Sequence, residues 1–290
     1  MNKILITGKN SYIGTSVENW LKKASQNFEV HTISLRDNSW KSHDLSQYDS
    51  IVHVAGIAHS DTGNASEETK QLYYQVNTHL TLELAEKAKA AGVKQFIFLS
   101  SMIVYGESAS IGTEKTITKD TTPKPANFYG DSKLQADLGL EKLNDKDFHV
   151  AIVRPPMIYG KGSKGNYPKL AKLAKVAPIF PDIQNVRSML HIDNLCEFIK
   201  LLIEEQDSGV FHPQNKEYVT TSEMVQEIGK AYNKNIVLTK VFNPVLKLAS
   251  RKVEILNKVF GNSAYAQELS EYKKDYRIRD FKETIKLTEG

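Results

Sequence analysis

The sequence predicts an α/β fold: a doubly wound parallel sheet with helices on both faces, together with a smaller α/β lobe. Short apolar segments alternate with helical patterns through the first half of the chain, as expected where each parallel strand is joined to the next by a helix. The chain has 290 residues, of which 40% are hydrophobic and 25% charged. It is therefore long and apolar enough to bury a large core.

Five strands are predicted in the first half from their apolar runs: residues 3–7, 28–33, 50–55, 95–100 and 149–154. The longest helical pattern covers residues 67–91. The second and third strands follow each other so directly that no crossover helix is expected between them. The second lobe is expected from residues 165–182 and from 216 onward, where residues 220–223 (Thr-Thr-Ser-Glu) have capping-box spacing before a helix.

A turn that carries glycines joins the first strand to the helical pattern of residues 12–21. The backbone N–H groups and the positive helix end at such a turn bind the pyrophosphate of a dinucleotide in Rossmann-type domains. The spacing is Gly8-x-x-Ser11-x-x-Gly14, so Ser11 stands where the usual turn has its middle glycine. The extra Cβ is expected to weaken cofactor binding or to shift the loop. The alternative is a strand–turn–helix that binds no nucleotide.

Tyr129 lies four residues before Lys133, a spacing that puts both side chains on one face of a helix. An ammonium in that position would favour the phenolate and lower the pKa of Tyr129 from about 10. A phenol tuned in this way exchanges a proton with a carbinol or carbonyl near neutral pH, and Ser101 would hold the same oxygen. The alternative is an exposed aromatic–cation pair, because such spacings also arise by chance on surface helices.

Seven segments occur in the order of a known family. They are residues 7–14 (Thr-Gly-Lys-Asn-Ser-Tyr-Ile-Gly), 53–56 (His-Val-Ala-Gly), 76–77 (Val-Asn), 96–106 (Phe-Ile-Phe-Leu-Ser-Ser-Met-Ile-Val-Tyr-Gly), 129–133 (Tyr-Gly-Asp-Ser-Lys), 154–160 (Arg-Pro-Pro-Met-Ile-Tyr-Gly) and 187–191 (Arg-Ser-Met-Leu-His). Together they resemble the extended short-chain dehydrogenase/reductase family, in its NAD(P)-dependent nucleotide-sugar epimerase/reductase branch. The resemblance covers nearly the whole chain and is greatest to the CapN-type 4-keto-6-deoxy-sugar reductases of capsular polysaccharide synthesis.

The resemblance implies a cofactor-binding domain and a substrate-binding lobe. Residues 1–164 plus 187–215 would form the NAD(P)-binding Rossmann domain, and residues 165–186 plus 216–290 the nucleotide-sugar-binding lobe. The residues implied in catalysis are Ser101, Tyr129 and Lys133. Those implied at the cofactor are Gly8, Ser11, Tyr12, Ile13, Gly14, Arg36, Asp44, Leu45, Ala55, Gly56, Asn77, Ser100, Tyr129, Lys133 and Pro156.

Four residues are implied at the substrate: Ser101, Met102, Asn166 and Arg187. Arg187 matches the family's arginine that reaches the sugar-nucleotide pyrophosphate, and a planar guanidinium suits the bridging of two phosphate oxygens. Asn166 matches the residue at the nucleotide end. The alternative for Arg187 is a surface ion pair of under about 1 kcal/mol.

The end of the second strand bears on the choice of cofactor. Sites that prefer NAD place an acidic residue there for the ribose hydroxyls, whereas an arginine accommodates a 2′-phosphate. Ser34 holds the acidic position and Arg36 lies two residues on, so NADP(H) is favoured over NAD(H). A slip of the alignment by one or two residues would bring Asp37 to the ribose and reverse this preference. Asp44 and Leu45 resemble the family's adenine contact, and a turn aspartate is the alternative.

The residues after Ser101 bear on the reaction. Dehydratases of this branch carry an Asp-Glu pair there, whereas this chain has Met102 and Ile103, which cannot shuttle protons. We therefore expect no 4,6-dehydration. The apparent NADP signature, the altered glycine turn and the CapN-like resemblance favour NADPH-dependent reduction of the C4 ketone of a UDP-linked 4-keto-6-deoxy-N-acetylhexosamine, giving for example UDP-D-FucNAc or UDP-QuiNAc. A UDP-sugar 4-epimerase with bound NAD would use the same residues. An alternative from another class is a catalytically silent NAD(P)-binding regulator.

Charge and composition limit the partners. A net charge of +4 with scattered lysines suits an anionic diphosphate and not a nucleic acid. The single cysteine, Cys196, excludes an internal disulfide, and no His or carboxylate cluster predicts a metal site. No stretch approaches the roughly 18 apolar residues of a spanning helix, so a cytoplasmic location is expected. The family's usual homodimer is carried over as an expectation.

Residues 243–260 combine apolar and basic side chains at helical spacing. We interpret this stretch as a helix that caps the second lobe. A helix that lies on a membrane surface is the alternative.

Overall fold

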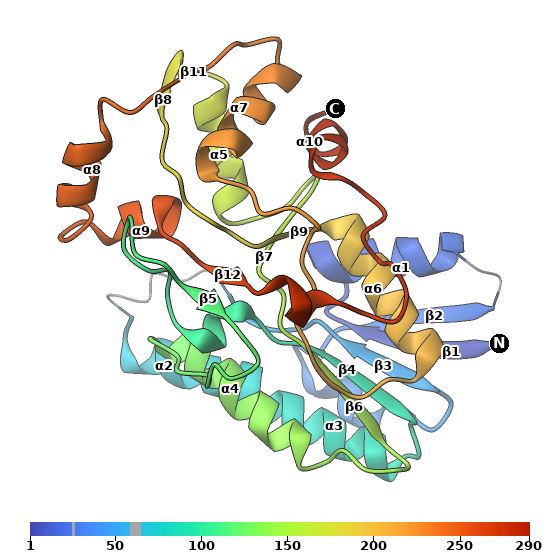
Figure 1. Cartoon of the computed structure of the whole chain (residues 1–290). Helices are drawn as coiled ribbons and strands as arrows, with labels where there is room; N and C mark the ends of the chain where they lie inside the picture. The colour runs from blue at the N-terminus through green and yellow to red at the C-terminus, as the bar shows by residue number, and fades with distance from the viewer. Residues whose placement is uncertain (25–26, 59–64) are drawn as a thin grey trace. The chain divides into compact units, whose positions relative to one another are not determined.

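The computed structural model describes residues 1–24, 27–58 and 65–290. These residues form two compact units, each made of several chain segments (Figure 1). Unit 1 comprises Met1–Gly106, Thr122–Pro155 and Leu195–Pro213, and unit 2 comprises Glu107–Thr121, Pro156–Asn194 and Gln214–Gly290.

Unit 1 is built on a six-stranded parallel sheet with the strand order β10-β6-β4-β3-β1-β2. The strands are β1 (Asn2–Thr7), β2 (Phe28–Ile33), β3 (Ser50–His53), β4 (Gln95–Leu99), β6 (His149–Val153) and β10 (Gly209–Phe211). The predicted doubly wound sheet is confirmed. Ile4, Leu5 and Ile6 in β1 are all buried, which is typical of a parallel strand covered on both faces.

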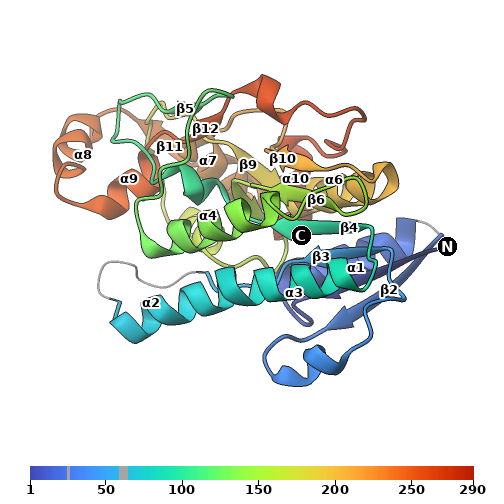
Figure 2. The same cartoon turned by 90° about the horizontal axis from the view of Figure 1, so that it is seen from below.

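Helices cover both faces of this sheet (Figures 1 and 2). One face carries α1 (Tyr12–Ala24) and α6 (Ile192–Glu205), which are joined by a hydrogen bond of 3.0 Å from Trp20 Nε1 to Glu197 Oε2. The other carries α3 (Leu80–Ala90) and α4 (Phe128–Glu141). Between β2 and β3 the structure has a 3₁₀ turn over Asn38–Ser42 in place of a crossover helix, as predicted.

The long helical pattern of residues 67–91 is interrupted. It forms α2 (Glu67–Tyr74), a π-helical turn (Gln75–His79) and α3. A π turn holds one extra residue in the helix and is frequent at functional sites. Here it carries Asn77, whose side chain is fully buried.

Unit 2 contains three short pairs of parallel strands and five helices among the described residues. The pairs are β5 (Thr116–Ile117) with β12 (Ala264–Tyr265), β7 (Met157–Tyr159) with β9 (Met189–His191), and β8 (Ile179–Pro181) with β11 (Val237–Thr239). The helices are α5 (Asn166–Ala174), α7 (Thr221–Ala231), α8 (Asn243–Ala249), α9 (Glu254–Phe260) and α10 (Phe281–Glu289). Tyr159, Met224 and Ile228 are fully buried members of its own hydrophobic core.

Two sequence expectations for unit 2 have clear outcomes. The capping box is confirmed, because Thr220 Oγ1 accepts from Glu223 N at 2.9 Å and Thr220 N donates to Glu223 Oε2 at 2.8 Å. The prediction of a single capping helix over residues 243–260 is wrong, because α8 ends at Ala249 and α9 begins at Glu254. At this break Asn257 Nδ2 donates to Ser250 O at 2.9 Å, so a side chain satisfies a carbonyl beyond the end of α8.

Candidate active site

The predicted cofactor and catalytic residues of unit 1 gather at one edge of the sheet. Gly8 follows β1, Arg36 lies beyond the end of β2, Ala55 and Gly56 follow β3, and Ser101 lies just beyond β4. These strands are parallel, so their carboxyl ends meet at the same edge. In open α/β sheets this edge is where ligands bind.

Ser11 caps the helix at the glycine turn. Its Oγ accepts a hydrogen bond of 3.0 Å from Gly14 N, the third residue of α1, and its own N donates to Gly8 O at 2.9 Å. Ser11 is not among the described non-glycine residues with positive φ, so its Cβ causes no backbone strain. A Cβ on Gly14 would lie 2.7 Å from Gly8 O, so glycine is required there. The serine therefore stabilises the helix start, a role that the sequence did not predict.

In the segment after β2, the guanidinium of Arg36 is exposed, whereas the carboxylate of Asp37 is hydrogen-bonded. Arg36 is exposed and has no ion-pair partner within the described part of the chain. Asp37 caps the 3₁₀ turn: its Oδ1 accepts from Ser39 N at 2.9 Å, and hydrogen bonds from Ser39 lower the pKa of this carboxyl. The carboxylate is thus held by its own turn, which leaves Arg36 as the free charge at the end of β2.

Asp44 is likewise engaged locally. Its Oδ1 accepts from Ser46 N at 2.9 Å and from Ser46 Oγ at 2.7 Å, and these bonds lower its pKa. Leu45 is buried in the core of unit 1. In the predicted adenine contact, the side chain of Asp44 therefore stabilises a turn and that of Leu45 packs in the core.

Buried hydrogen bonds fix the segment after β3. Thr81 Oγ1 donates to Asn77 O at 2.9 Å, so it accepts from His53 Nε2 at 2.9 Å. His53 Nδ1 then accepts from Thr7 Oγ1 at 2.8 Å, and Thr7 Oγ1 accepts from Ala55 N at 3.2 Å. Burial lowers the pKa of His53 to about 3, so the ring is neutral and the chain of donors is complete.

Asn77 holds the next turn of the same segment. Its Oδ1 accepts from Ile57 N at 2.8 Å, and its Nδ2 donates to Ile57 O at 3.1 Å and to Ser132 Oγ at 3.1 Å. One buried amide therefore ties the chain after β3 to α4. The same contacts place Gly56, between Ala55 and Ile57, at the edge where the cofactor is predicted.

Ser101 begins a 3₁₀ turn over Met102–Tyr105, and its Oγ accepts from Ile103 N at 3.2 Å. Met102 is buried, and its N donates to Pro155 O at 2.9 Å. The positions where a dehydratase would need an acid and a base are thus apolar side chains held in a tight turn.

Two residues that the sequence analysis missed position Tyr129. Asn127 caps α4, with Oδ1 accepting from Gly130 N at 2.9 Å. A Cβ on Gly130 would lie 2.9 Å from Ile103 O, so only glycine allows α4 to approach the 3₁₀ turn this closely. Because the turn begins at Ser101, this approach brings Tyr129 into hydrogen-bond reach of Ser101.

The predicted lowering of the Tyr129 pKa is wrong for this structure. Burial of the hydroxyl raises the pKa of Tyr129 to about 12, and the hydrogen bond with Ser101 opposes this shift only in part. Tyr73, whose ring packs edge-on at 5.9 Å, raises it further. Desolvation therefore keeps Tyr129 a neutral phenol, which is the form that donates a proton.

Lys133 is a buried cation, 5% exposed. Its Nζ donates to Leu99 O at 3.0 Å and lies 4.6 Å from the centre of the Phe98 ring. Burial lowers the pKa of Lys133 to about 8, while the nearby carboxylate of Asp137 opposes the shift. The ammonium is thus positioned by a strand carbonyl and an aromatic face.

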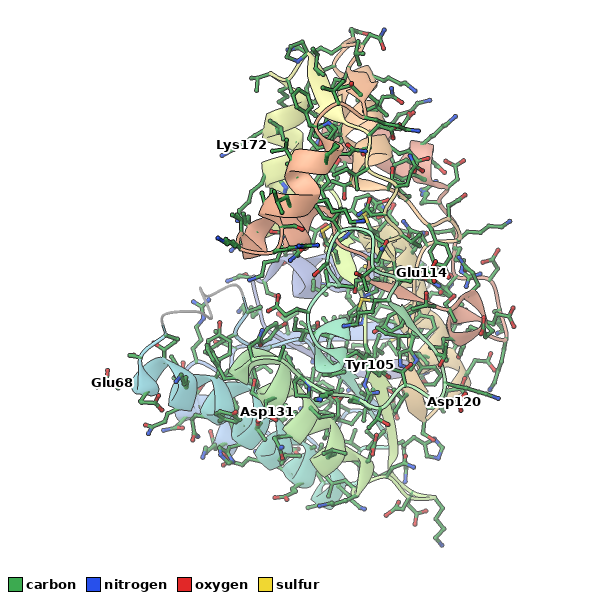
Figure 3. The ribbon with its side chains drawn as sticks, turned by 60° about the vertical axis from the view of Figure 1, so that its left-hand side comes forward. Glu68, Tyr105, Glu114, Asp120, Asp131 and Lys172 are labelled. Carbon is green, nitrogen blue, oxygen red and sulfur yellow. The ribbon has the colours of Figure 1, made fainter. Side chains whose placement is uncertain are left out.

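Behind Lys133 lies a buried polar network that the sequence analysis also missed. Arg154 Nε donates to Asp137 Oδ2 at 2.9 Å, and Arg154 Nη1 donates to Tyr105 OH at 2.8 Å. Tyr105 OH lies 2.9 Å from His212 Nε2 (Tyr105 is labelled in Figure 3). Burial raises the pKa of Asp137 to about 6, with Arg154, Ser100 and Lys133 opposing the rise. The spacing of Lys133 and Asp137 along α4 was the signal available in the sequence.

Two predicted substrate residues lie at a cavity within unit 2. Arg187 Nη1 donates to Gly261 O at 3.0 Å, and burial lowers the pKa of this guanidinium to about 10. No ion-pair partner for it occurs among the described side chains. The cavity, of about 120 Å³, is lined by Met157, Asn166, Lys169, Leu170, Arg187, Met189, Thr221, Met224, Ile255, Lys258 and Val259. Three cations in a largely apolar wall suit a compact anion.

The part of the chain that the structure describes has neither a metal-binding cluster nor a membrane-spanning helix. No group of three or more His, Cys, Asp or Glu side chains is placed to hold a metal ion. No helix there is long and apolar enough to cross a membrane.

A family model described as "NAD dependent epimerase/dehydratase family" matches residues 4–219. This span includes the glycine turn, Ser101, Tyr129, Lys133 and Arg187. The chain belongs to this family. The family resemblance predicted from the sequence is therefore confirmed.

Two curated relatives are 4-epimerases. The UDP-glucose 4-epimerase of Vibrio cholerae is 34% identical over 190 residues, which cover 63% of this chain and 57% of that protein. The N-acetyl-alpha-D-glucosaminyl-diphospho-ditrans,octacis-undecaprenol 4-epimerase of Escherichia coli O157:H7 is 27% identical over 280 residues, which cover 90% of this chain and 81% of that protein. This chain thus spans less than two thirds of the first relative.

A reductase has the same fold. The dTDP-4-dehydrorhamnose reductase of Clostridium acetobutylicum superposes with a TM-score of 0.72 at 20% identity, covering 98% of this chain and 97% of that structure. The fold is therefore shared by enzymes that reduce and enzymes that epimerise sugars.

Removing the Ser11 cap tests the structure of the glycine turn. Ser11→Ala should lower the free energy of unfolding by about 0.5–2 kcal/mol, whereas Ser11→Gly should cost only a few tenths. Urea denaturation measures both. Ser16→Ala is the control, since Ser16 Oγ donates to Tyr12 O within α1 and caps nothing. A Ser11→Ala protein as stable as the wild type would contradict the capping role.

The buried Lys133 predicts a pH dependence. Its pKa is lowered to about 8, and in the role predicted for it the charged form supports proton donation by Tyr129. The protonated fraction falls as pH rises through this value, so kcat for reduction should be level below about pH 8 and fall above it. Lys133→Met should lose this limb along with most activity, and Lys142→Met, an exposed lysine at the end of α4, should keep it. A wild-type profile that stays flat to pH 10 would contradict the assignment.

Proposed function

We propose that this protein is an NADPH-dependent reductase of the C4 ketone of a UDP-linked 4-keto-6-deoxy-N-acetylhexosamine, with UDP-D-FucNAc or UDP-QuiNAc as representative products. The observation that carries the proposal is the arrangement of Tyr129, close enough to Ser101 for that hydroxyl to affect its pKa and one helical turn from the buried ammonium of Lys133, beside an apolar turn at Met102 and Ile103. Among the described residues after Ser101, the arrangement provides Tyr129 as a proton donor and no acid–base pair at positions 102 and 103 for eliminating water.

The residues at the sheet edge fit a dinucleotide. Gly14 packs on Gly8 O without room for a Cβ, and α1 begins at the turn, so backbone N–H groups and a helix N-terminus face the same point. Bound NADPH would supply the hydride. The proposed cofactor residues beside Arg36, Tyr129 and Lys133 are Gly8, Ser11, Tyr12, Ile13, Gly14, Asp44, Leu45, Ala55, Gly56, Asn77, Ser100 and Pro156.

The protein's own residues would handle the proton. Tyr129 is held neutral by burial, so it donates its proton to the oxygen at C4 as negative charge develops there. Ser101 positions the same oxygen by a hydrogen bond. Lys133 stays charged below pH 8 and stabilises the phenolate that remains.

The end of β2 supports NADP(H). Arg36 is an exposed guanidinium, which suits the extra phosphate of NADP(H). Asp37 is held by Ser39, so it offers less to the ribose hydroxyls that NAD presents. A reductase consumes its cofactor in each turnover, which agrees with a preference for NADPH.

Arg187 is proposed to hold the diphosphate of the substrate and Asn166 its nucleotide end. A half-buried guanidinium without an ion-pair partner in the described structure is partly desolvated and gains from an arriving anion, and the lysines of the same cavity add to its attraction. Residues 165–186 plus 216–290 remain the proposed sugar-nucleotide-binding lobe. The cytoplasmic location, the homodimer and a place in polysaccharide precursor synthesis also stay predictions.

The second candidate is a 4-epimerase with retained NAD. The observation in its favour is that the two curated relatives act as 4-epimerases, one on UDP-glucose and one on a sugar linked through a diphosphate to undecaprenol. An epimerase would use the same Ser101, Tyr129 and Lys133. It differs in returning the hydride to the sugar, so it consumes no cofactor.

The two candidates give different results with purified protein. We expect NADPH to be oxidised with a UDP-4-keto-6-deoxy-N-acetylhexosamine, one NADPH per product, and kcat/KM to be higher for NADPH than for NADH. The absorbance of NADPH measures its oxidation and the kcat/KM values, and NMR identifies and quantifies the product. The controls are 4-hydroxy UDP-sugars, which a reductase leaves unchanged.

Epimerisation of a 4-hydroxy sugar with NAD retained through purification would replace the reductase with the second candidate. NADPH binding without turnover on any of these sugars would instead favour the silent regulator. A ratio of kcat/KM for NADPH over NADH below one would contradict the role given to Arg36.

A further inference from the structure

The segment of residues 237–255 in unit 2 exposes many large apolar side chains. Seven lie between residues 237 and 255, and three of them are at least 66% exposed: Val241, Val245 and Leu248. The full set is Val237, Val241, Phe242, Val245, Leu248, Val253 and Ile255. We call this set the apolar face. Single exposed apolar residues are normal, but a cluster of this kind marks an interaction surface.

The same segment carries a strong excess of positive charge. Residues 234–258 contain one acidic residue, Glu254, against six basic ones: Lys234, Lys240, Lys247, Arg251, Lys252 and Lys258. The whole chain is nearly balanced, with 38 basic and 34 acidic residues. Within the described side chains, Lys240, Lys247, Arg251 and Lys252 form no ion pairs, and all four are exposed.

The apolar face is fixed to the fold and is not needed for its core. Asn243 Nδ2 donates to Asp182 O at 2.8 Å, and Asp182 N donates to Thr239 O at 2.8 Å, so the start of α8 is tied to β8 and β11 (Figure 1). Other apolar residues of the segment, Leu246 and Leu256, pack against the core of unit 2. Leu246 and Leu256 thus face the core, whereas Val241, Val245 and Leu248 are exposed; Ile255 also lines the cavity that contains Arg187.

We propose that the apolar face and its surrounding cations dock unit 2 onto an anionic lipid bilayer. Short helices with Lys and Arg beside Phe, Leu and Val lie in the interface of such membranes, with the apolar side chains below the headgroups. Each cation near an anionic surface contributes about 1 kcal/mol. The proposal does not rest on the reaction proposed above.

Charge and chemistry favour a membrane over other partners. A nucleic acid would match the cations, but it offers no apolar layer for Phe242 and Leu248. A second copy of this chain would place the same six cations of residues 234–258 against one another, which is repulsive. A bilayer that contains phosphatidylglycerol satisfies the charge and the apolar side chains together.

Vesicle sedimentation with the full chain tests the docking. The wild type should bind vesicles of phosphatidylcholine mixed with phosphatidylglycerol at low salt, bind much less to pure phosphatidylcholine, and be released by high salt. Arg251→Gln with Lys252→Gln should weaken binding about tenfold or more, as expected from the loss of two cations near the surface. Val245→Ser with Leu248→Ser should weaken it at both salt concentrations.

Matched control variants in unit 1 test whether binding depends on the apolar face in particular. Lys142→Gln with Lys146→Gln removes two exposed cations from unit 1, and Leu72→Ser removes an exposed apolar side chain there, so both proteins should bind vesicles as the wild type does. Circular dichroism should show all variants folded. Absence of wild-type binding at low salt would overturn the proposal. An equal loss of vesicle binding in the control variants would also overturn it. So would a wild-type oligomer that the apolar-face variants dissociate, if neither wild type nor variants bind vesicles.

Discussion

The buried ammonium of Lys133 is the constraint on which the rest of the candidate active site depends. A charge removed from water is stable only where polar groups or opposite charges surround it. Leu99 O accepts from it at 3.0 Å, the Phe98 ring faces it, and the carboxylate of Asp137 lies one helical turn on. Asp137 is in turn paired with Arg154. The position of α4 on the sheet is therefore tied to a polar network that runs through the interior of unit 1.

The same burial gives the two neighbouring groups opposite tendencies. It raises the pKa of the phenol of Tyr129 and lowers the pKa of the ammonium of Lys133, which brings both closer to their neutral forms. Below about pH 8, where the ammonium of Lys133 keeps its charge, a neutral phenol in this position can give a proton and the ammonium can then stabilise the phenolate. Unit 2 shows a related effect, because partial burial also lowers the pKa of the Arg187 guanidinium. In both units, desolvation disfavours the charged form of a basic side chain.

Local patterns predicted much of this structure. The strands, the glycine turn and the capping box at Thr220 rest on residues close in sequence, and the ordered motifs were enough to indicate the family. What the sequence could not predict depends on contacts between distant segments. The rise in the Tyr129 pKa comes from desolvation and from Tyr73, and the close approach of Gly130 depends on Ile103 O. The periodicity of residues 243–260 is continuous, whereas the structure has a break there at which Asn257 Nδ2 donates to Ser250 O.

Turnover of Tyr129→Phe tests the central claim, that this phenol is the proton donor, most directly. The variant should bind NADPH nearly as the wild type does and lose roughly 10²–10⁴ in kcat for reduction of the 4-keto sugar, as expected when a general acid is removed. Tyr74→Phe is the matched control, because Tyr74 OH donates to Asp131 at 2.7 Å and its pKa is also raised to about 12. It should keep its turnover. Near-normal kcat in Tyr129→Phe, with NADPH bound, would contradict the account.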